Sequence, residues 1–351
     1  MRSAISSKSH LFPVLSTTVG PAASSGVASL CGLLHILHSR CKTTLAYDEV
    51  VAHPPDKGNT GQLRLGLIVH GLLGTGRNWR TFARSLAKQA AAESGRGWRI
   101  ILVDQRNHGL SAELAGFDPP HTLQAAAQDL HELIQQKYNS QQLSVMVGHS
   151  LGGKTTLAYL KQMAAMPTKS HLPQQVWILD SNIGKVTPNK DAPSDVDRVI
   201  KEIKGLQHPI ASREWLYKFM EDQGYSLGLR LWMGSNLVPD GQGKLKWGFN
   251  IEGASDMYQS YQESSYWDLV QQPPKGTALH IVRAEKSDRW TRETMSQLQK
   301  AEYAAAAHAS SGSGGRLHTH VLSNAGHWVH VDNPQGLLDI MLPSLVNTDI
   351  G

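Results

Sequence analysis

A serine between two glycines is the feature of this sequence that most clearly carries chemistry. Ser150 stands in the pattern Gly148-x-Ser150-x-Gly152. The apolar run Leu143 to Val147 precedes it and is typical of a strand buried in a parallel sheet, while a helix-forming run begins at Leu151. Between strand and helix this pattern forms a sharp turn, in which the glycines leave room around the serine. The sequence therefore predicts that Ser150 is an exposed nucleophile at the carboxyl end of a strand.

A histidine near the carboxyl terminus is the candidate base for this serine. His327 follows the last predicted strand, His318 to Leu322, in the loop Asn324-Ala325-Gly326-His327. The order serine, acid, histidine along the chain is the order that a strand-turn-helix serine hydrolase requires. We therefore expect His327 to take the proton of Ser150 and to return it to the leaving group.

A glycine-rich loop is the candidate for stabilising a developing oxyanion. The apolar run Leu65 to Val69 predicts a strand that ends in the segment His70 to Gly76, which contains three glycines. Glycines allow the backbone to approach a substrate closely. The expected oxyanion donors are the N–H of Leu72 in this loop and the N–H of Leu151 at the start of the helix.

These residues are positioned by a predicted mostly parallel, doubly wound sheet of the α/β class. The apolar runs that predict its strands are Leu65 to Val69, Arg99 to Val103, Leu143 to Val147, Val176 to Leu179, Leu279 to Val282 and His318 to Leu322. Crossover helices are predicted over Asn78 to Lys88, Thr122 to Tyr138 and from Leu151 towards Met163. In the second helix we expect Thr122 as the N-cap, with Asp129 and Glu132 on the outer face.

The hydrophobic pattern changes between residues 188 and 270. Helices are predicted there over Ser194 to Leu206, Ser212 to Gln223 and Ser255 to Glu263, with many aromatic residues among them. We interpret this segment as a cap over the nucleophile that shapes the substrate pocket, although packing alone accounts for most of the aromatic residues. The predicted organisation is a leader (1–45), a first part of the core (46–187), the cap (188–270) and a second part of the core (271–351).

The loop after the strand Arg99 to Val103 is interpreted as structural. Asp104, Arg106 and Asn107 are expected to bond backbone groups and to brace it. An acid at a strand end could bind a ribose, but no Gly-x-Gly-x-x-Gly pattern precedes Asp104, so no dinucleotide site is predicted.

Composition excludes several classes of function. The bases Arg2, Lys8, Arg40 and Lys42 all precede the first acid, Asp48, so most of the formal net charge of +5 belongs to the leader. The remaining chain carries no basic footprint for nucleic acid. Cys31 and Cys41 are the two cysteines, which leaves none for a disulfide, a zinc site or a nucleophile after the leader. No cofactor and no metal site are predicted, because the histidines lack the helical spacing of metal ligands.

The first 45 residues have the composition of an organellar import sequence. They are rich in Ser, Ala and Thr, carry scattered bases and contain no acid. A disordered tail is the alternative. The longest apolar run, Val27 to Leu37, falls short of the ~20 residues of a membrane-spanning helix, so no transmembrane segment is predicted.

Four motifs occurring in one order resemble the α/β-hydrolase superfamily. They are His70-Gly-Leu-Leu-Gly, Arg106-Asn-His-Gly-x-Ser111, Gly148-His-Ser-Leu-Gly-Gly-Lys154 and Gly326-His-Trp-Val-His330. Within that superfamily the chain, from about Ala46 to its end, is most similar to the small serine-esterase branch and to hydrolases of plant and algal plastids. The resemblance implies an α/β-hydrolase fold with a mainly helical cap. It favours import into the chloroplast over the mitochondrion.

The resemblance also defines the candidates for the acid of the triad. In most α/β-hydrolases the acid lies in a turn after the strand that corresponds to Leu279 to Val282. Ser287 occupies that position here, and Asp288 follows one residue later. The related small esterases instead take the acid from the strand after the nucleophile, which implies Asp180. We favour Asp180, with Asp288 as the runner-up and Glu285 third; a backbone-capping role is the alternative for Asp180.

The predicted function is that of a serine hydrolase acting on a small-molecule ester or thioester of a small or medium acyl group. Acyl transfer, cleavage of a carbon–carbon bond and thioesterase activity alone are alternatives on the same triad. A ligand-binding protein that retains the triad but turns over slowly is a further alternative, from another class. The substrate and the oligomeric state are not predicted by the sequence.

Overall fold

The computed structural model describes residues 44–55, 62–139, 141–168, 171–187, 194–206 and 209–347. Apart from residues 44 and 45, the predicted leader lies outside the described residues, as do residues 188–193 at the start of the predicted cap. The folded unit that contains all the described residues runs from Lys42 to Gly351.

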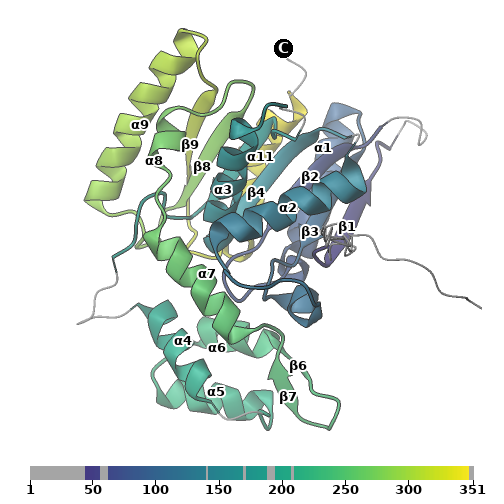
Figure 1. Ribbon diagram of the computed structural model, residues 1–351, viewed down its shortest axis with the longest axis vertical. Coiled ribbons are helices and arrows are strands. Elements are labelled where there is room, and N and C mark those ends of the chain that lie inside the picture. Colours follow the sequence, from purple (N-terminus) through teal and green to yellow (C-terminus); the bar gives the residue numbers. More distant parts are fainter. Residues whose placement is uncertain are drawn as a thin grey trace, which may run out of the picture. The chain divides into compact units, whose positions relative to one another are not determined.

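A seven-stranded sheet in the order β1-β3-β2-β4-β5-β8-β9 forms the centre of this unit (Figure 1). Its strands are β1 (Tyr47–Ala52), β2 (Arg64–Val69), β3 (Trp98–Val103), β4 (Leu143–His149), β5 (Gln175–Leu179), β8 (Ala278–Ala284) and β9 (Arg316–Leu322). All neighbours pair in parallel except β1, which pairs antiparallel with β3. The predicted fold class is confirmed, and each predicted strand is present with its ends moved by a few residues.

Strand β1 is absent from the sequence prediction for a physical reason. It lies at the edge of the sheet, and only Val50 among its residues is buried. An edge strand does not need the continuous apolar run by which the buried strands are recognised.

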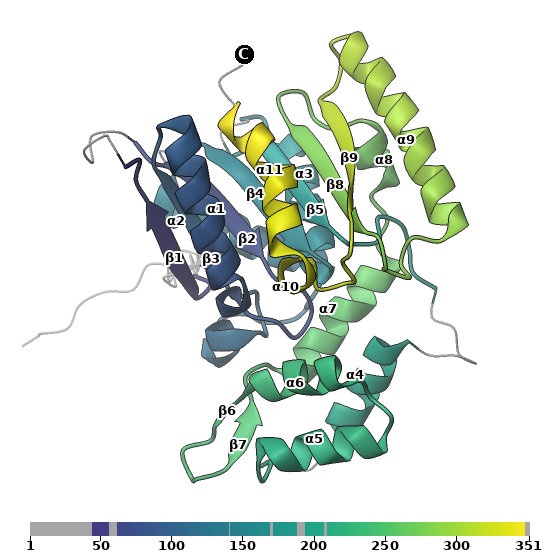
Figure 2. The same ribbon diagram turned by 180° about the vertical axis from the view of Figure 1, so that it is seen from behind.

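Helices cover both faces of the sheet (Figures 1 and 2). On one face, α1 (Arg80–Ser94), α10 (Val329–Asp332) and α11 (Pro334–Val346) pack against one apolar cluster. On the other, α2 (Leu123–Tyr138), α3 (Leu151–Ala165), α8 (Trp267–Gln271) and α9 (Arg292–Ser310) pack against a second. The pleat divides each strand between the two clusters: in β3, Ile100 and Leu102 face the first, whereas Ile101 and Val103 face the second.

One detail of α2 contradicts the sequence prediction. Thr122 caps the helix as predicted, because its side chain accepts a hydrogen bond from the N–H of Ala125. Asp129, however, is buried rather than on the outer face, and both of its oxygens accept hydrogen bonds from the guanidinium of Arg106. The helical period predicts the side of α2 on which Asp129 lies, but it does not predict that the loop carrying Arg106 covers this side of the helix.

None of the described helices combines the length and the apolar run needed to cross a bilayer.

The segment interpreted as a cap has its own apolar cluster. It contains α4 (Asp195–Gly205), α5 (Arg213–Asp222), α6 (Leu227–Ser235), the hairpin of β6 (Leu237–Pro239) and β7 (Leu245–Trp247), and α7 (Ile251–Glu263). Helix α6 is absent from the sequence prediction because Gly228 and Gly234 weaken its helix propensity. Gly234 is needed there, since a Cβ at this position would lie 2.3 Å from the ring of Tyr217 in α5.

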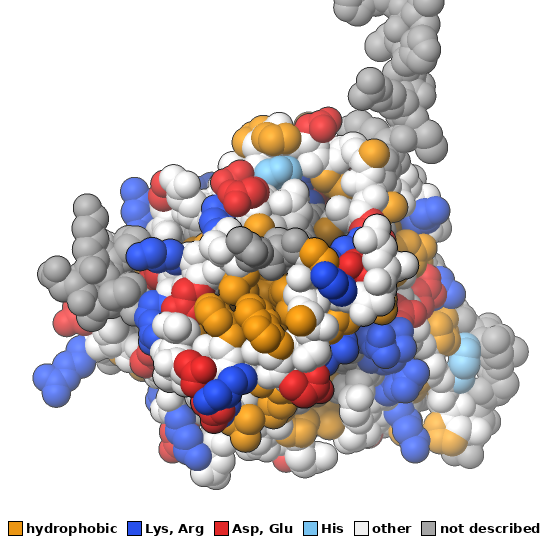
Figure 3. Space-filling model, turned by 90° about the horizontal axis from the view of Figure 1, so that it is seen from below, with side chains coloured by type: hydrophobic (Ala, Val, Ile, Leu, Met, Phe, Trp, Pro, Cys, Tyr) orange, Lys and Arg blue, Asp and Glu red, His pale blue; other side chains and the backbone are white. Residues whose placement is uncertain are grey.

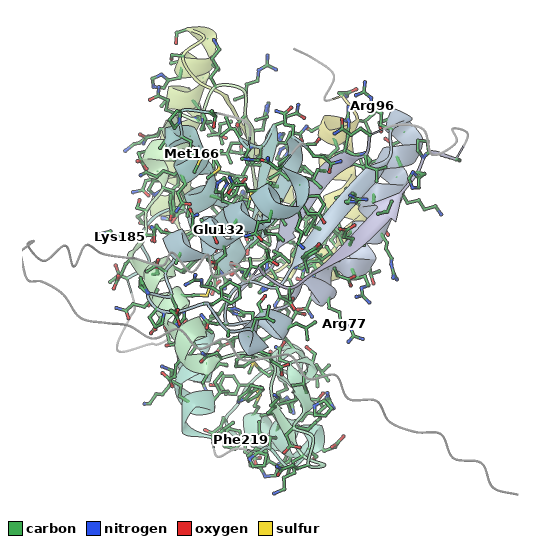
Figure 4. The ribbon with its side chains drawn as sticks, turned by 45° about the vertical axis from the view of Figure 1, so that its right-hand side comes forward. Arg77, Arg96, Glu132, Met166, Lys185 and Phe219 are labelled. Atoms are coloured by element: carbon green, nitrogen blue, oxygen red, sulfur yellow. The ribbon has the colours of Figure 1, made fainter. Side chains whose placement is uncertain are left out.

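The carboxyl ends of the parallel strands point toward the cap. Arg77, in the short turn η1 (Gly76–Trp79) after β2, lies on the part of the core nearest the cap (Figure 4). Arg96, just before β3, lies at the opposite end of the core, and Phe219 of α5 lies within the cap. The loop after β2 therefore lies at the end of the core that faces the cap (Figure 4). This is the edge at which parallel α/β sheets bind their ligands.

Candidate active site

Ser150 adopts a strained backbone conformation between β4 and α3. Its φ is 54° and its ψ is −120°, outside the regions favoured for residues with a side chain. The flanking glycines are required, because a Cβ at Gly148 would lie 2.3 Å from the carbonyl oxygen of Gly152. A Cβ at Gly152 would lie 2.4 Å from the carbonyl oxygens of Val69 and His70. The pattern recognised in the sequence thus produces a turn that only glycine permits on both sides.

Asp180 and His327 are joined by a direct hydrogen bond. Nδ1 of His327 lies 2.8 Å from Oδ2 of Asp180, so the imidazole donates to the carboxylate. Asp180 follows β5 directly, has a φ of 42° and is fully buried. Strand β5 lies beside β4, so the residues after the two strands emerge at the same edge.

The carboxylate of Asp180 is held by three further donors. The N–H of Ala284 and the indole Nε1 of Trp290 donate to Oδ1 at 3.0 and 2.7 Å. The hydroxyl of Ser287 donates to Oδ2 at 2.8 Å. The sequence contained one signal of this arrangement, namely a serine at the position where the resemblance places an acid.

Burial and hydrogen bonding fix the charges of this pair in opposite senses. Burial acts to raise the pKa of Asp180, but the hydrogen bond and charge of His327 and the Trp290 and Ala284 donors outweigh it, and the pKa falls below its ordinary value. Burial lowers the pKa of His327, and the Asp180 bond offsets only part of that effect. Near neutral pH the imidazole is therefore uncharged, with its Nδ1 proton donated to Asp180 and its Nε2 left as an acceptor.

Neither of the two alternative acids forms a hydrogen bond or ion pair with His327, although the charge of Asp288 acts to raise the pKa of this histidine. The side chain of Asp288 is 93% exposed, and its contact is with Arg289 at 3.4 Å. The carboxylate of Glu285 accepts a hydrogen bond of 2.7 Å from the N–H of Asn324. Of the three candidates, Asp180 alone contacts His327 among the described residues.

His149, the last residue of β4, connects the serine turn to His327. Nε2 of His149 donates to the carbonyl oxygen of His327 at 2.8 Å, and the two imidazoles lie 4.6 Å apart. The hydroxyl of Ser150 makes no hydrogen bond to another described residue. Such contacts often form only when substrate is bound, so the free hydroxyl is compatible with a role for His327 as its base.

The glycine-rich loop lies directly against the serine. A Cβ at Gly71 would be 3.2 Å from the Cβ of Ser150. Leu151 is the first residue of α3, where a backbone N–H has no partner within the helix. The N–H of Leu72 takes part in none of the backbone hydrogen bonds of the described turns and loops. These two N–H groups are therefore the candidates for an oxyanion site.

The loop conformation depends on a strained leucine. Leu73 has a φ of 54°, which for a residue other than glycine costs on the order of 1–3 kcal/mol. Its side chain is only 1% exposed. Burying a leucine stabilises by about 1.5–3 kcal/mol, so burial of this side chain is large enough to offset the strain.

Lys154, which belongs to a motif but received no role from the sequence, is buried beside the cap. Its ammonium donates to the carbonyl oxygens of Gly184, Tyr261 and Ser264 at 2.6, 2.6 and 2.9 Å. Gly184 lies on the chain that leaves the core for the cap, and the other two lie on its return. Burial lowers the pKa of Lys154 to about 7. The lysine thus ties both connections to the helix that follows Ser150.

The cap also approaches the residue next to the histidine. A Cβ at Gly228 of α6 would lie 3.1 Å from the indole of Trp328, and the rings of Trp232 and Trp328 are 6.2 Å apart. Large exposed apolar side chains of the cap are those of Trp215, Leu227 and Leu231. Figure 3 shows hydrophobic side chains gathered on the face seen from below, with charged side chains around them.

The brace predicted for the loop after β3 is confirmed for Asp104 and Arg106, whereas the side chain of Asn107 bonds no backbone group of the described residues and instead donates to Sδ of Met257 at 3.8 Å. Asp104 accepts hydrogen bonds from the N–H groups of Gly76 and Leu110 at 2.7 and 2.9 Å. Arg106 donates to the carbonyl oxygens of Asp118 and Pro120, in addition to its pair with Asp129. The loop also contains the short turn η2 (Gly109–Glu113).

No group of three or more His, Cys, Asp or Glu side chains in the described ranges is arranged to hold a metal ion. A cavity of about 500 Å³ lies between α9 and the outer strands β8 and β9, and Ser150, Asp180 and His327 are not among its lining residues.

Comparisons with known proteins agree with this fold. Residues 67–340 match the sequence model described as the alpha/beta hydrolase family. The chain is 26% identical over 278 residues to the mouse (Mus musculus) sn-1-specific diacylglycerol lipase ABHD11, which covers 78% of each chain. It is 26% identical over 287 residues to the esterase YbfF of Escherichia coli (strain K12), covering 78% of this chain and 89% of that one. Among solved structures, an esterase from a marine microorganism superposes with a TM-score of 0.64 and 20% identity, over 86% of this chain and 98% of that one.

Proposed function

The chain belongs to the alpha/beta hydrolase family, and on that premise we propose that it hydrolyses carboxylic esters or thioesters through an acyl-enzyme on Ser150. The observation that carries this proposal is the combination of a strained serine turn with the buried Asp180–His327 pair at the same sheet edge. The esterase and lipase names of the relatives support the same reaction class.

The proposed reaction has two halves. Oγ of Ser150 attacks the carbonyl carbon while Nε2 of His327 takes its proton, and the negative oxygen is received by the N–H groups of Leu72 and Leu151. The tetrahedral intermediate then expels the alcohol or thiol, which takes the proton from the imidazolium. Water, activated by His327, attacks the acyl-enzyme and releases the acid with free Ser150. Asp180 keeps the imidazole oriented and stabilises its charged form.

A covalent serine probe tests this proposal. A fluorophosphonate should label the protein in a one-to-one ratio, and Ser150→Ala should remove both labelling and hydrolysis of a chromogenic acetate. Loss of a triad nucleophile costs on the order of 10⁶ in kcat in a well-studied protease. Labelling that survives in the Ser150→Ala variant would exclude this serine as the nucleophile.

The same assay separates the alternatives. A burst of chromophore followed by steady turnover indicates a hydrolase, whereas a burst without turnover indicates a binding protein that retains the triad. A burst whose turnover increases with an added alcohol or amine indicates acyl transfer. The substrate panel includes short acyl esters and a diacylglycerol, because the relatives include both an esterase and a diacylglycerol lipase. It also includes medium acyl thioesters and a compound whose carbon–carbon bond can be hydrolysed, which test the alternative reactions.

We also propose that the leader directs the protein into an organelle, with the chloroplast favoured over the mitochondrion. The absence of acids before Asp48 and the abundance of Ser, Ala and Thr support this. A fluorescent protein fused to residues 1–45 should enter plastids of an algal or plant cell. Fluorescence confined to the cytosol would contradict the proposal.

A further inference from the structure

The loop proposed to supply an oxyanion donor is packed into the cap. Leu73 belongs to an apolar cluster whose other buried members all come from the cap segment: Val199, Ile203, Ile210, Leu216, Met220, Tyr225, Met233, Leu237, Trp247, Phe249 and Ala254. Leu72, which is partly buried, packs against this cluster and also against the cluster under α2 and α3. The side chains of the loop therefore extend from the core into the interior of the cap.

A second connection joins the cap, through its backbone, to the loop after β3, which lies next to the oxyanion loop. Phe249, just before α7, forms an antiparallel bridge with His108, and the N–H of Asn250 donates to the carbonyl oxygen of Asn107 at 2.8 Å. The contact is close, since a Cβ at Gly253 would lie 2.3 Å from the Asn107 side chain. The start of α7 is thus fixed to the loop after β3.

Two neutral imidazoles continue this connection to the oxyanion loop. The rings of His108 and His70 lie 5.1 Å apart. His70 donates from Nδ1 to the carbonyl oxygen of Gly71 at 2.7 Å and accepts at Nε2 from the N–H of Gln105 at 3.0 Å. Burial lowers the pKa of His70 to about 4 and is the main cause that lowers the pKa of His108 to about 3. Both rings stay uncharged near neutral pH, so His70 can keep one donor and one acceptor in place.

The packing of Leu73 in the cap cluster and the chain of contacts through His108 and His70 both lead to Gly71. It precedes Leu72 and Leu73, its carbonyl oxygen accepts from His70, and its backbone lies against Ser150. The same carbonyl oxygen accepts from the N–H of Gly74 at 3.1 Å, which closes the turn that contains both leucines. A shift of the cap cluster that moves Leu73 would therefore also move the peptide between Gly71 and Leu72, which lies in the same turn.

We propose that the cap positions the oxyanion loop, with Leu73 as the positioning residue that links the cap interior to the N–H of Leu72. This inference rests on the proposed hydrolase function and adds a role for the cap beyond covering the substrate. The backbone of Leu73 depends on the cap, because its strained left-handed conformation persists only while the cap cluster buries the side chain. Packing defects inside the cap should therefore lower catalysis of a substrate too small to reach the cap.

The test uses matched methionine truncations in the full-length protein. Met220→Ala opens a cavity inside the cap cluster, whereas Met341→Ala opens one under α11, in the apolar cluster on one face of the sheet; the two side chains are 2% and 0% exposed. With p-nitrophenyl acetate, Met220→Ala and Leu73→Ala should lower kcat at least tenfold and change KM less than about twofold. Met341→Ala should change kcat less than threefold. Loss of one oxyanion donor costs about 10²–10³ in kcat, so a tenfold loss corresponds to partial misplacement.

A transition-state analogue distinguishes positioning from a general loss of folding. The inhibition constant of an aryl trifluoromethyl ketone should rise in Met220→Ala by the same factor as kcat falls, because both depend on the oxyanion donors. Met220→Leu, which nearly conserves volume, should restore both values. An unchanged kcat in a folded Met220→Ala variant, or a loss expressed in KM alone, overturns the inference.

Hydrogen exchange tests the link without any catalysis. In Met220→Ala the amides of residues 72–74 should exchange at least tenfold faster than in the unmodified protein, and in Met341→Ala they should not. Equal exchange in both variants overturns the inference even if Ser150 is labelled by fluorophosphonate. Absence of labelling in the unmodified protein, with the exchange difference present, contradicts the proposed function and leaves the cap-to-loop link established.

Discussion

The hydroxyl of Ser287 donates to Oδ2 of Asp180 at 2.8 Å, and the same oxygen accepts from Nδ1 of His327. Ser287 stands in the turn after β8 where the resemblance implies an acid, and Asp180 stands after the adjacent strand β5. The two strands run in parallel with Leu179 paired to Val282, so their ends reach the same place. A carboxylate from either strand can therefore approach the imidazole, and here the serine supports the acid of the neighbouring strand.

Asp180→Asn should lower kcat by roughly 10³ to 10⁴, because the imidazole loses both its orientation and the stabilisation of its charged form. Asp288→Asn should change kcat only a few-fold, since that side chain is 93% exposed. Steady-state kinetics with a chromogenic ester measures both. Each variant must first show an unchanged melting temperature, and the reverse order of the two losses would return the acid to the turn after β8.

Moving the carboxylate to the neighbouring strand should restore part of the activity. Combining Ser287→Asp with Asp180→Asn places a new carboxylate at residue 287, whose side chain lies at hydrogen-bond distance from the side chain of residue 180. We expect kcat to recover at least tenfold relative to Asp180→Asn alone. Asp288 provides the control: adding Asp288→Asn to the double variant should leave the recovery unchanged. No recovery in a folded double variant would mean that the turn at Ser287 cannot direct a carboxylate to His327.

The acid limb of the pH profile should have its midpoint below 6.5. His327 acts as a base only when uncharged, and burial lowers its pKa despite the opposing hydrogen bond of Asp180. The value of kcat/KM should therefore rise with pH through this lowered pKa and stay constant above it. Asp180→Asn removes a group that raises the pKa, so its residual activity should show a limb at still lower pH. A midpoint above 7 in the unmodified protein would refute this account.

Lys154→Met should destabilise the protein by about 2–4 kcal/mol, because three buried carbonyl oxygens lose their donor while the cost of burying the ammonium is relieved. The melting temperature should fall by about 4–10 °C. Lys161→Met is the matched control on the same helix, since its pair with Asp268 is exposed and contributes little. Thermal unfolding followed by circular dichroism measures both variants, and equal shifts would show that Lys154 has no special role in holding the cap.

The buried strands were predictable from sequence because burial on both faces requires a continuous apolar run. β4 and β5 are buried at every position, and a short apolar run bounded by polar residues and glycines is typical of such a strand. Helix α6 was not predictable, because its stability comes from packing against α5 and overrides the low propensity of its glycines. Edge strand β1 escaped prediction for the related reason that its pairing partner, rather than its own composition, makes it a strand.

The sequence by itself determined the turn that contains Ser150, because the steric limits of that turn act between neighbouring residues and demand glycine at fixed spacing. It could only narrow the choice of acid, because Asp180 and Asp288 both follow predicted strands and differ in which tertiary donors surround them. The burial of Asp129 and the strain at Leu73 were likewise decided by partners far away in the chain, Arg106 and the cap cluster. Steric limits within a turn depend on adjacent residues, whereas the burial and the charge of a side chain depend on which distant segments the fold brings together.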